Sequence, residues 1–418
     1  MKVYKFGGAS IKDAQAVQNL KSIIDSESGL CIIVSAMGKT TNHLEKVVEL
    51  YLNEGDWRTA LSGVVEFHRS VLGELNANAQ ECLDTIAKIE HYAMTFLEQD
   101  EDSETDFIYD QIVSLGEILS TKIIESFLNS KASTVKWLDA RKLIHTNNSY
   151  KNARVNWEVT REQITEAFTD DNGVYLSQGF VGGGDHNRMT TLGREGSDYS
   201  AAIFAHCLDA ESVTIWKDVA GMLNADPSHF SNTTLLPNIS YREAVELSYY
   251  GASVIHPKTI KPLENKQIPL QVKSFLNPDA SGTLINQNTA EDRNIPSYIF
   301  SNDQILLSIS SRDFSFIVEE HISELFDAFA RHGLKIQTMQ NSAISFSVSL
   351  ANEKEKIDLL IRELESSYKV LYNDGLELLT IRHYNEPIVS ELIKDREILL
   401  EQKTRQTMRV LMRAQTAE

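Results

Sequence analysis

The first 285 residues alternate between short runs of strand length and longer runs with helical spacing. Residues 30–36 form a continuous apolar run, the pattern of a strand covered on both faces of a parallel sheet, and residues 2–6 fit a similar buried strand. Residues 14–25 and most of 43–129 carry apolar side chains at spacings of three and four, which predicts helices. This alternation predicts an α/β fold, a parallel-rich sheet sandwiched by helices.

Further strands, and then a change of pattern, follow toward the carboxyl end. Four more segments read as strands of the same sheet: 133–138, 173–183, 212–218 and 268–275. The polar residues 286–300 predict a linker that ends a first domain of residues 1–285. Residues 301–372 then show the β-α-β-β-α-β series of a ferredoxin-like α+β unit. Residues 373–418 offer a strand, a helix and the strand "TMRVLMR", which predicts a truncated second module.

Length and charge narrow the class of protein. With 418 residues, the chain is expected to form two or three domains. The excess of 59 acidic over 40 basic residues argues against binding to nucleic acid or an anionic membrane, although a few local donors can hold a small anion. Cys31, Cys82 and Cys207 lack metal-ligand spacing and suit a reduced compartment. With no signal peptide or membrane-spanning run in the sequence, we expect a soluble cytoplasmic protein without a metal site of its own.

Polar, glycine-containing turns follow four of the predicted strands. They are "KFGGAS" (5–10), "VSAMGKTTN" (34–42), "TTLGREGSDYSAA" (190–202) and "WKDVAGMLNADP" (216–227). Ligands of parallel α/β sheets bind at the carboxyl ends of the strands, so we expect the four turns to build one crevice. In the first turn, Gly7 and Gly8 let the backbone approach a ligand, and Lys5 adds a positive charge beside them. An ordinary turn remains the alternative for that segment taken alone.

The turn at residues 190–202 carries the densest candidate chemistry. Gly193 and the N–H groups that begin the following helix can hold phosphate or carboxylate oxygens. Arg194 can grip a carboxylate with two parallel hydrogen bonds. Asp198 is an acceptor in the first helical turn, where a helix cap is the simpler interpretation of that residue by itself.

These turns, together with "GASVIHPKT" (251–259), resemble in order and spacing the signature turns of aspartate kinases. The resemblance makes residues 1–285 an amino-acid-kinase catalytic domain and residues 301–372 and 373–418 ACT-type regulatory modules, without the homoserine dehydrogenase domain that some members carry. It implies transfer of the γ-phosphoryl group of ATP, with Mg²⁺, to the side-chain carboxylate of L-aspartate. The product is 4-phospho-L-aspartate, the first step toward lysine, threonine and methionine.

The resemblance also implies roles for individual residues. Lys5 would meet the transferring phosphoryl group and Asp198 would orient that lysine; no general base is needed, because a carboxylate is already a nucleophile. The implied phosphate contacts are Gly7, Gly8, Ser10 and Gly193. The implied substrate contacts are Thr41, Glu117, Arg194 and Ser197, with Glu117 taking the α-ammonium group. Glu117 by itself fits a solvated helix face, but the neighbouring Gly116 is unusual inside a helix.

The nucleotide side departs from the family pattern. The implied nucleotide contacts are Lys217, Asp218, Asp226, Ser253, Val254 and Lys258. Many members have a threonine at position 217 and basic residues at positions 228 and 253, where this chain has serines. We therefore predict that Lys217, and in second place Lys258, restore the lost positive charge. Glu195 replaces a glycine of the signature turn, and we expect its side chain to point to solvent.

The regulatory region and the alternatives for function stay open. ACT modules pair between subunits and bind an amino acid at the seam, so the resemblance implies a homodimer or higher homo-oligomer. Gln337 and Ala343 stand where lysine-inhibited relatives have acidic residues, and a dimerisation unit without an effector is the alternative. A kinase for another carboxylate, such as glutamate or N-acetylglutamate, is a second possibility that "GREGSDYSAA" and the ACT modules disfavour. A non-catalytic amino-acid sensor is the third, which retention of Lys5, Arg194 and Asp198 disfavours.

Overall fold

The structure, a computed structural model, describes residues 1–77, 79–100, 102–131, 134–230, 232–252, 255–313 and 315–414. The chain divides into two compact units. Unit 1 comprises residues 1–222, 235–248 and 253–292, and unit 2 comprises residues 223–234, 249–252 and 293–418. Within the described ranges, no helix combines the length and apolar character that a membrane crossing needs.

Unit 1 is built on an eight-stranded sheet in the order β3-β4-β2-β1-β7-β9-β10-β8. Its strands are β1 (Lys2–Phe6), β2 (Leu30–Val34), β3 (Val135–Leu138), β4 (Val174–Gln178), β7 (Ser212–Lys217), β8 (Asn238–Ser240), β9 (Leu270–Ser274) and β10 (Thr283–Asn286). All neighbours run parallel except β9 and β10. The predicted parallel-rich sheet is confirmed, and β2 is buried along its whole length as its apolar run indicated.

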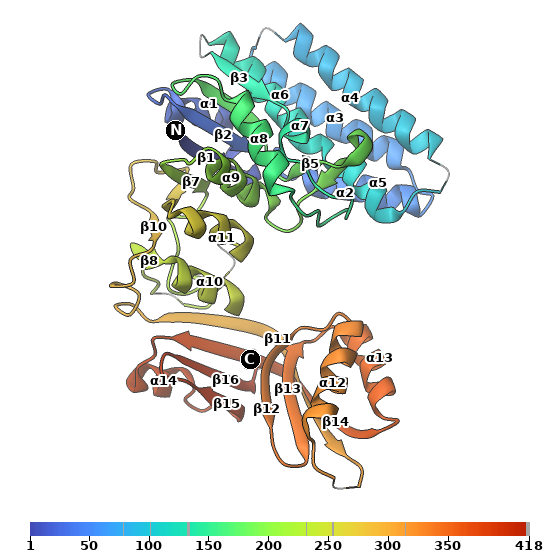
Figure 1. Ribbon diagram of the computed structural model, residues 1–418, viewed down its shortest axis with the longest axis vertical. Helices are drawn as coiled ribbons and strands as arrows, with labels where there is room; N and C mark the ends of the chain where they lie inside the picture. Colours follow the sequence, from blue (N-terminus) through green and yellow to red (C-terminus); the bar gives the residue numbers. More distant parts are fainter. Residues whose placement is uncertain are drawn as a thin grey trace. The chain divides into compact units, whose positions relative to one another are not determined.

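Helices account for most of the rest of unit 1 (Figure 1). They are α1 (Ala14–Ile24), α2 (Thr40–Leu52), α3 (Trp57–Glu74), α4 (Gln80–Gln99), α5 (Thr105–Val113), α6 (Leu115–Ser130), α7 (Ala140–Leu143), α8 (Trp157–Ala167), α9 (Gly196–Cys207), α10 (Tyr241–Tyr250) and α11 (Pro257–Lys266), with short 3₁₀ turns η1 (Gly8–Ile11) and η2 (Asp185–Asn187). A small hairpin of β5 (Val181–Gly183) and β6 (Met189–Thr191) precedes α9.

Helices cover both faces of the sheet, and the side chains of β1 alternate between these two helical layers. Tyr4 and Phe6 belong to one hydrophobic core with α1, α3 and α6. Lys5 lies between them in sequence and therefore points to the opposite face, where α9 contacts β1, β2 and β7. Helix α9 comes close to the sheet because it is rich in small residues, and a Cβ at Gly196 would lie 2.6 Å from the Phe180 ring. Strand β1 thus places Lys5 beside the first turn of the buried helix α9.

Unit 2 contains a six-stranded antiparallel sheet in the order β12-β13-β11-β14-β16-β15. Its elements are β11 (Ser297–Ser311), α12 (Glu319–Arg331), β12 (Ile336–Asn341), β13 (Ser345–Ala351), α13 (Lys354–Leu364), β14 (Tyr368–Arg382), α14 (Glu386–Leu392), β15 (Ile398–Lys403) and β16 (Thr407–Arg413). The order β12-β13-β11-β14, with α12 and α13, is the ferredoxin-like arrangement that the sequence predicts. The predicted β-α-β-β-α-β series is therefore present.

The two long strands β11 and β14 each take part in two halves of this sheet. Their pairing shifts register between Ser301 and Gln304, which separates residues 297–301 from the ferredoxin-like half. The first half of β11 pairs with residues 378–382 of β14, and those residues pair in turn with β16. The sequence assigns residues 297–300 to the linker and leaves residues 398–403 without an element, whereas both segments are strands here. The second half of the sheet thus has four strands, one of them contributed by residues that precede the first module.

Candidate active site

A cavity of about 650 Å³ in unit 1 brings together residues from all four polar turns. Of the residues selected from the sequence, it is lined by Lys5, Gly8, Thr41, Glu117, Gly193, Arg194, Ser197, Asp198 and Lys217. These residues come from the ends of β1 and β7, from η1, from the first turns of α2 and α6, and from the turn that leads into α9 together with its first turn. The predicted crevice at the carboxyl ends of the strands is therefore present as a single cavity.

Two lysines converge on one buried aspartate in this cavity. Lys5 Nζ lies 2.7 Å from Asp198 Oδ1, and Lys217 Nζ lies 3.4 Å from Asp198 Oδ2. Asp198 is 2% exposed and Lys5 7%, whereas Lys217 keeps a fifth of its side chain accessible. Burial by itself would raise the pKa of Asp198, but the two ammonium groups lower it below the usual carboxyl value. The carboxylate is thus held ionised, and the pair of lysines leaves a net positive charge facing the cavity.

Close packing of the first two turns fixes the backbone beside these charges. A Cβ at Gly8 would lie 2.8 Å from the carbonyl oxygens of both Ala36 and Gly38, so no larger residue fits without displacing a backbone. The Gly38 N–H donates to Gly8 O at 3.1 Å, which joins the turns directly. This packing explains the glycine that the sequence places after the strand, and it positions Lys5 at the cavity wall.

Glu117 enters the same cavity from α6. The Ala36 N–H donates to its Oε1 at 3.3 Å, while Oε2 is buried without a hydrogen-bond partner among the described residues. Burial raises the pKa of Glu117 from 4.5 to about 8. Gly116 makes the position possible, because a Cβ there would lie 3.0 Å from Ala36 Cβ and 3.1 Å from Thr40 Cγ2. A buried carboxyl with a free oxygen is suited to receive a cationic group.

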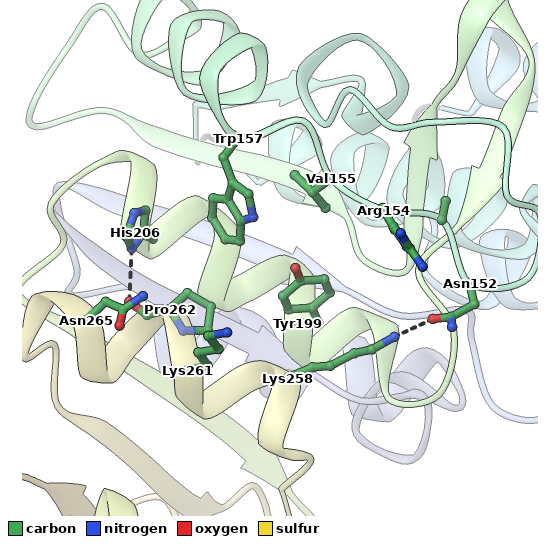
Figure 2. A pocket seen from close by; sticks show the side chains of 11 residues that line it. Asn152, Arg154, Val155, Trp157, Tyr199, His206, Lys258, Lys261, Pro262 and Asn265 are labelled. Atoms are coloured by element: carbon green, nitrogen blue, oxygen red, sulfur yellow. Dashed lines mark hydrogen bonds between the residues drawn. The ribbon is translucent and has the colours of Figure 1, made fainter. Parts of the chain in front are cut away.

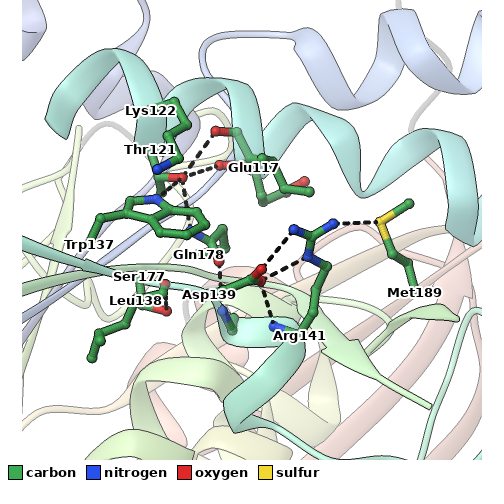
Figure 3. A network of polar contacts seen from close by, with 12 residues as sticks. Glu117, Thr121, Lys122, Trp137, Leu138, Asp139, Arg141, Ser177, Gln178 and Met189 are labelled. Carbon is green, nitrogen blue, oxygen red and sulfur yellow. Dashed lines mark hydrogen bonds and ion pairs between the residues drawn. The ribbon is translucent and has the colours of Figure 1, made fainter. Parts of the chain in front are cut away.

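A polar network anchors α6 to strands β3 and β4 (Figure 3). Thr121 Oγ1 donates to the Glu117 carbonyl at 3.0 Å and accepts from Trp137 Nε1 at 3.1 Å and Gln178 Nε2 at 3.0 Å. Gln178 Oε1 accepts from the Ala140 N–H at 2.7 Å. These bonds hold the backbone of Glu117 against the sheet, so its carboxyl group is presented from a fixed position.

Asp110 of α5 holds the hairpin that leads into the arginine-bearing turn. Its carboxylate accepts from Thr191 N at 2.8 Å, Thr191 Oγ1 at 2.7 Å and Lys151 N at 3.1 Å. Burial raises the pKa of Asp110 to about 6, against the opposing effect of these donors. These contacts join α5, the backbone at Lys151 and β6, next to the turn that carries Gly193 and Arg194.

The expectation for Glu195 is wrong. Its Oε2 is buried without a hydrogen-bond partner among the described residues, rather than pointing to solvent. The backbone has φ 53° and ψ 30°, a left-handed conformation that a glycine adopts freely and that costs a glutamate on the order of 1 kcal/mol. The turn therefore keeps a shape suited to glycine although the residue has changed.

Several residues selected from the sequence lie away from this cavity. Ser10 is buried and its hydroxyl donates to Trp216 O at 3.2 Å, which joins η1 to β7. Asp218 is exposed beyond β7 and does not line the cavity. Gly7 does not line the cavity either, although a Cβ there would lie 3.4 Å from Lys5 Nζ. Lys258 opens into a different cavity, where its Nζ contacts Asn152 Oδ1.

Three further selections fall outside unit 1 or outside the described residues. Asp226 belongs to unit 2, where it accepts from the N–H of Ser228 at 2.8 Å and from its hydroxyl at 2.7 Å. The Ser228 hydroxyl that replaces a basic residue of the family thus serves this local turn. Ser253 and Val254 lie outside the described residues. The nucleotide roles of all three stay predictions.

The structure adds cavity residues that the sequence did not single out. They include Glu45, Tyr109, Lys151 and Phe180. Lys151 Nζ lies 2.8 Å from Asp106 Oδ1 and 4.7 Å from the centre of the Tyr109 ring, and Tyr109 donates to Glu45 Oε1 at 2.7 Å. No sequence motif marks these residues, because helices and loops far apart in the chain bring them together. Lys151 thus lines the cavity wall with its charge paired to Asp106.

A parallel-rich α/β sheet, with a charged cavity at its strand ends and glycine turns in the cavity wall, defines an α/β protein with its ligand site where parallel sheets usually carry one. A family model described as the amino acid kinase family matches residues 1–274. The chain belongs to the amino acid kinase family.

Individual relatives are consistent with that assignment. Aspartokinase 1, chloroplastic, of Arabidopsis thaliana is 30% identical over 87% of this chain and 67% of its own length. A bifunctional aspartokinase/homoserine dehydrogenase of Buchnera aphidicola is 29% identical over 90% of this chain, which spans 47% of that longer protein. Among solved structures, Escherichia coli aspartokinase III in complex with aspartate and ADP has a TM-score of 0.82 at 26% identity, covering 99% of this chain and 96% of that one. These matches extend over both units.

Proposed function

We propose that this protein is an aspartate kinase, which transfers the γ-phosphoryl group of ATP to the side-chain carboxylate of L-aspartate and releases 4-phospho-L-aspartate. The observation that carries the proposal is the cavity itself. In one space it combines the Lys5–Asp198–Lys217 cluster, the arginine of the glycine turn and the buried carboxyl of Glu117. The complex of the E. coli relative with aspartate and ADP supports the same pair of ligands.

Charged side chains in the cavity would hold the α-carboxylate and the α-ammonium group of L-aspartate. Arg194 offers a planar fork for the α-carboxylate, with Ser197 and Thr41 as hydroxyl donors in the same wall. Glu117 Oε2, which lacks a partner in the described residues, would accept from the α-ammonium group. The side-chain carboxylate is then left free to attack phosphorus without a general base, so positioning and charge neutralisation supply the catalysis.

The phosphate groups of ATP would be bound by Lys5, Lys217 and the backbone of the first and third turns. Negative charge spreads over the transferring oxygens, and Lys5 is positioned by Asp198 to meet it. Mg²⁺ would be held chiefly by the nucleotide, because Asp198 is already engaged by two lysines and the described residues contain no cluster of three potential metal ligands. The metal would neutralise phosphate charge that the lysines leave uncompensated.

The proposal is tested by trapping the acyl phosphate with hydroxylamine. Purified protein with MgATP should form the hydroxamate with L-aspartate at least a hundred times faster than with L-glutamate or N-acetyl-L-glutamate. A preference for either of the latter two would assign the chain to another carboxylate kinase. Binding of L-aspartate without any hydroxamate would instead identify an amino-acid sensor.

Exchanging Arg194 for lysine should impair the use of aspartate far more than the use of ATP. Lysine keeps the positive charge but loses the planar pair of donors. We expect the KM for aspartate to rise by about tenfold or more, since a charge-assisted contact contributes roughly 1.5–3 kcal/mol. Initial rates of the Arg194→Lys variant across both substrates give the two KM values. Equal increases for ATP and aspartate would remove Arg194 from the substrate clamp.

Aspartate binding should strengthen as the pH rises toward 8. Because the folded-state pKa of Glu117 is raised to about 8, the empty site keeps a proton that an incoming α-ammonium group displaces. The same shift means that Glu117 stabilises the ligand-free fold at low pH, and that this contribution is lost as the pH rises through 8. The Kd for aspartate should therefore fall by roughly tenfold between about pH 6.5 and pH 8.

Calorimetry in buffers of different ionisation enthalpy measures the Kd and the released proton together. Glu117→Gln, which keeps the shape but cannot titrate, should bind aspartate more weakly and release no proton. A wild-type Kd that is flat over this range would contradict the proposed role of Glu117.

Lysine at millimolar concentration should inhibit weakly or not at all. E. coli aspartokinase III has been solved with lysine and aspartate bound, but Gln337 and Ala343 of this chain provide no negative charge at the positions that the family resemblance implies. Titration of wild type with lysine tests this directly, and the pair Gln337→Asp with Ala343→Glu should gain sensitivity. Strong inhibition of wild type, with lysine bound within residues 301–350, would overturn the prediction.

The domain boundaries of the sequence analysis remain part of the proposal. Residues 1–285 would carry the reaction, and residues 301–372 and 373–418 would form ACT modules that pair between subunits. The ferredoxin-like order of strands in unit 2 supports that assignment.

A further inference from the structure

A second cavity of about 490 Å³ lies in unit 1, and none of its lining residues lines the proposed active site (Figure 2). Its wall is formed by residues 152–155, by Trp157 at the start of α8, by one side of α9 and by one side of α11. In Figure 2, the charged ends of Arg154 and Lys258 lie at one end of the drawn cavity, and the rings of Trp157 and His206 lie at the other. Two cations thus lie opposite the aromatic end, while the third, Lys261, is drawn beside Pro262 and away from them.

The charge of this cavity is unbalanced. Arg154, Lys258 and Lys261 all line it, and none of the described lining residues is acidic. No ion pair within the described ranges neutralises Arg154 or Lys261, and Lys258 Nζ contacts the neutral Asn152 amide oxygen. Burial also lowers the pKa of Lys258, as expected for an ammonium group without a counter-ion. In a chain of net charge −19, three unneutralised cations around one space favour an anion carrying more than one charge.

The opposite wall offers flat apolar surfaces. The rings of Trp157 and His206 meet edge to face at 5.1 Å between centres, and those of Trp157 and Tyr199 at 6.4 Å. His206 is fixed by a contact of its Nδ1 with the Pro262 carbonyl at 3.0 Å. Trp157 is 37% exposed, so its ring is accessible to a ligand. Such a set of rings suits the stacking of a planar ring.

We propose that this cavity is a second ligand site, which binds a phosphorylated compound with a planar ring, of about the size of a nucleoside monophosphate. The phosphate would be bound by Arg154 and Lys258, the ring would lie against Trp157 and Tyr199, and Lys261 would add to the positive charge that attracts the anion.

The two cavities share one wall. Lys151 lines the proposed active site, and the next residue, Asn152, lines the second cavity. A Cβ at Gly193 would lie 3.0 Å from Asn152 Oδ1 and 3.1 Å from Lys151 O, so the glycine turn packs against this segment. A test of the second site must therefore separate binding there from binding in the active site.

AMP is the probe, titrated into the full-length protein by calorimetry and by tryptophan fluorescence. Wild type should bind it, and the double exchange Arg154→Gln with Lys261→Gln should weaken binding by about tenfold or more. Lys217→Ala, which alters the active site, and Lys354→Gln, which removes an exposed charge on α13 of unit 2, should leave this binding unchanged. Trp157→Phe should abolish most of the fluorescence change.

Three further ligands dissect the recognition. Adenosine lacks the anion and ribose 5-phosphate lacks the ring, so each should bind at least tenfold more weakly than AMP. Tighter binding of 1-naphthyl phosphate than of AMP would assign the site to ring phosphates other than nucleotides, and the reverse would assign it to nucleotides. The proposal is overturned if AMP does not bind at millimolar concentration, or if ribose 5-phosphate or adenosine binds as tightly as AMP. It is also overturned if Lys217→Ala, rather than the Arg154→Gln and Lys261→Gln pair, weakens AMP binding.

Discussion

Exchange of Lys5 for methionine should lower kcat by about 10²–10³-fold, with a much smaller change in the KM for aspartate. Lys5 is buried, lies 2.7 Å from Asp198 Oδ1 and faces the cavity in which the phosphoryl group would be transferred. The charge that it meets develops mainly in the transition state, so its loss affects the chemical step more than binding. Steady-state rates of hydroxamate formation for Lys5→Met give both constants.

The Lys5 experiment needs a control for folding. Removing one partner of a buried ion pair leaves an uncompensated charge, which typically costs about 3–5 kcal/mol, although Lys217 compensates Asp198 in part. The double variant Lys5→Met with Asp198→Asn removes both charges and should be at least as stable as the single variant. Both should be inactive. Retention of more than half of kcat by a folded variant would remove Lys5 from the mechanism.

Exchange of Lys217 for alanine should raise the KM for ATP by about 10- to 150-fold and leave the KM for aspartate nearly unchanged. The chain lacks two basic residues of the family pattern, and Lys217 extends from the end of β7 to within 3.4 Å of Asp198 Oδ2, beside Lys5. A charge-assisted contact to phosphate contributes roughly 1.5–3 kcal/mol, and each 1.4 kcal/mol changes an equilibrium tenfold. Because Lys217 is partly exposed, the effect should shrink in high salt.

ATP titrations at two ionic strengths, for wild type and Lys217→Ala, measure this effect. Lys46→Ala removes an exposed lysine of α2 that pairs with Glu49, and it should behave as wild type. If the ATP KM of Lys217→Ala is unchanged at low salt, the lost cations are replaced elsewhere. Lys151, which lines the same cavity, is then the next residue to exchange.

Candidate site residues could be predicted from the sequence where they lie at the end of a strand. A buried strand followed by a glycine turn is a local pattern, and parallel strands bring such turns to one edge, so Lys5, Gly8, Arg194 and Asp198 could be placed in one crevice. Gly116 was a useful signal as well, because a glycine inside a helix marked the close approach of α6 that admits Glu117. Fold class and most of the cavity were therefore predictable.

What the sequence missed depends on contacts between distant segments. The approach of Lys217 to Asp198 requires β7 to lie beside β1, in the register that pairs Phe6 with Trp216. Lys258 follows a family motif but begins a helix that turns it toward Asn152 and the second cavity. The buried oxygen of Glu195 and the strand at residues 398–403 are likewise decided by packing partners elsewhere in the chain. Local patterns carry none of this information.

The shared strands of unit 2 constrain the order in which a growing polypeptide can fold. Residues 297–301 are the first strand residues of this sheet to be synthesised, but their partners are residues 378–382, which pair in turn with β16 near residue 410. The ferredoxin-like half can close once residue 376 is available, whereas the first half of β11 pairs with residues about eighty positions later and its half of the sheet is complete only after β16 has been made. Until then it is an unpaired strand edge, the kind of surface that chaperones protect on the ribosome.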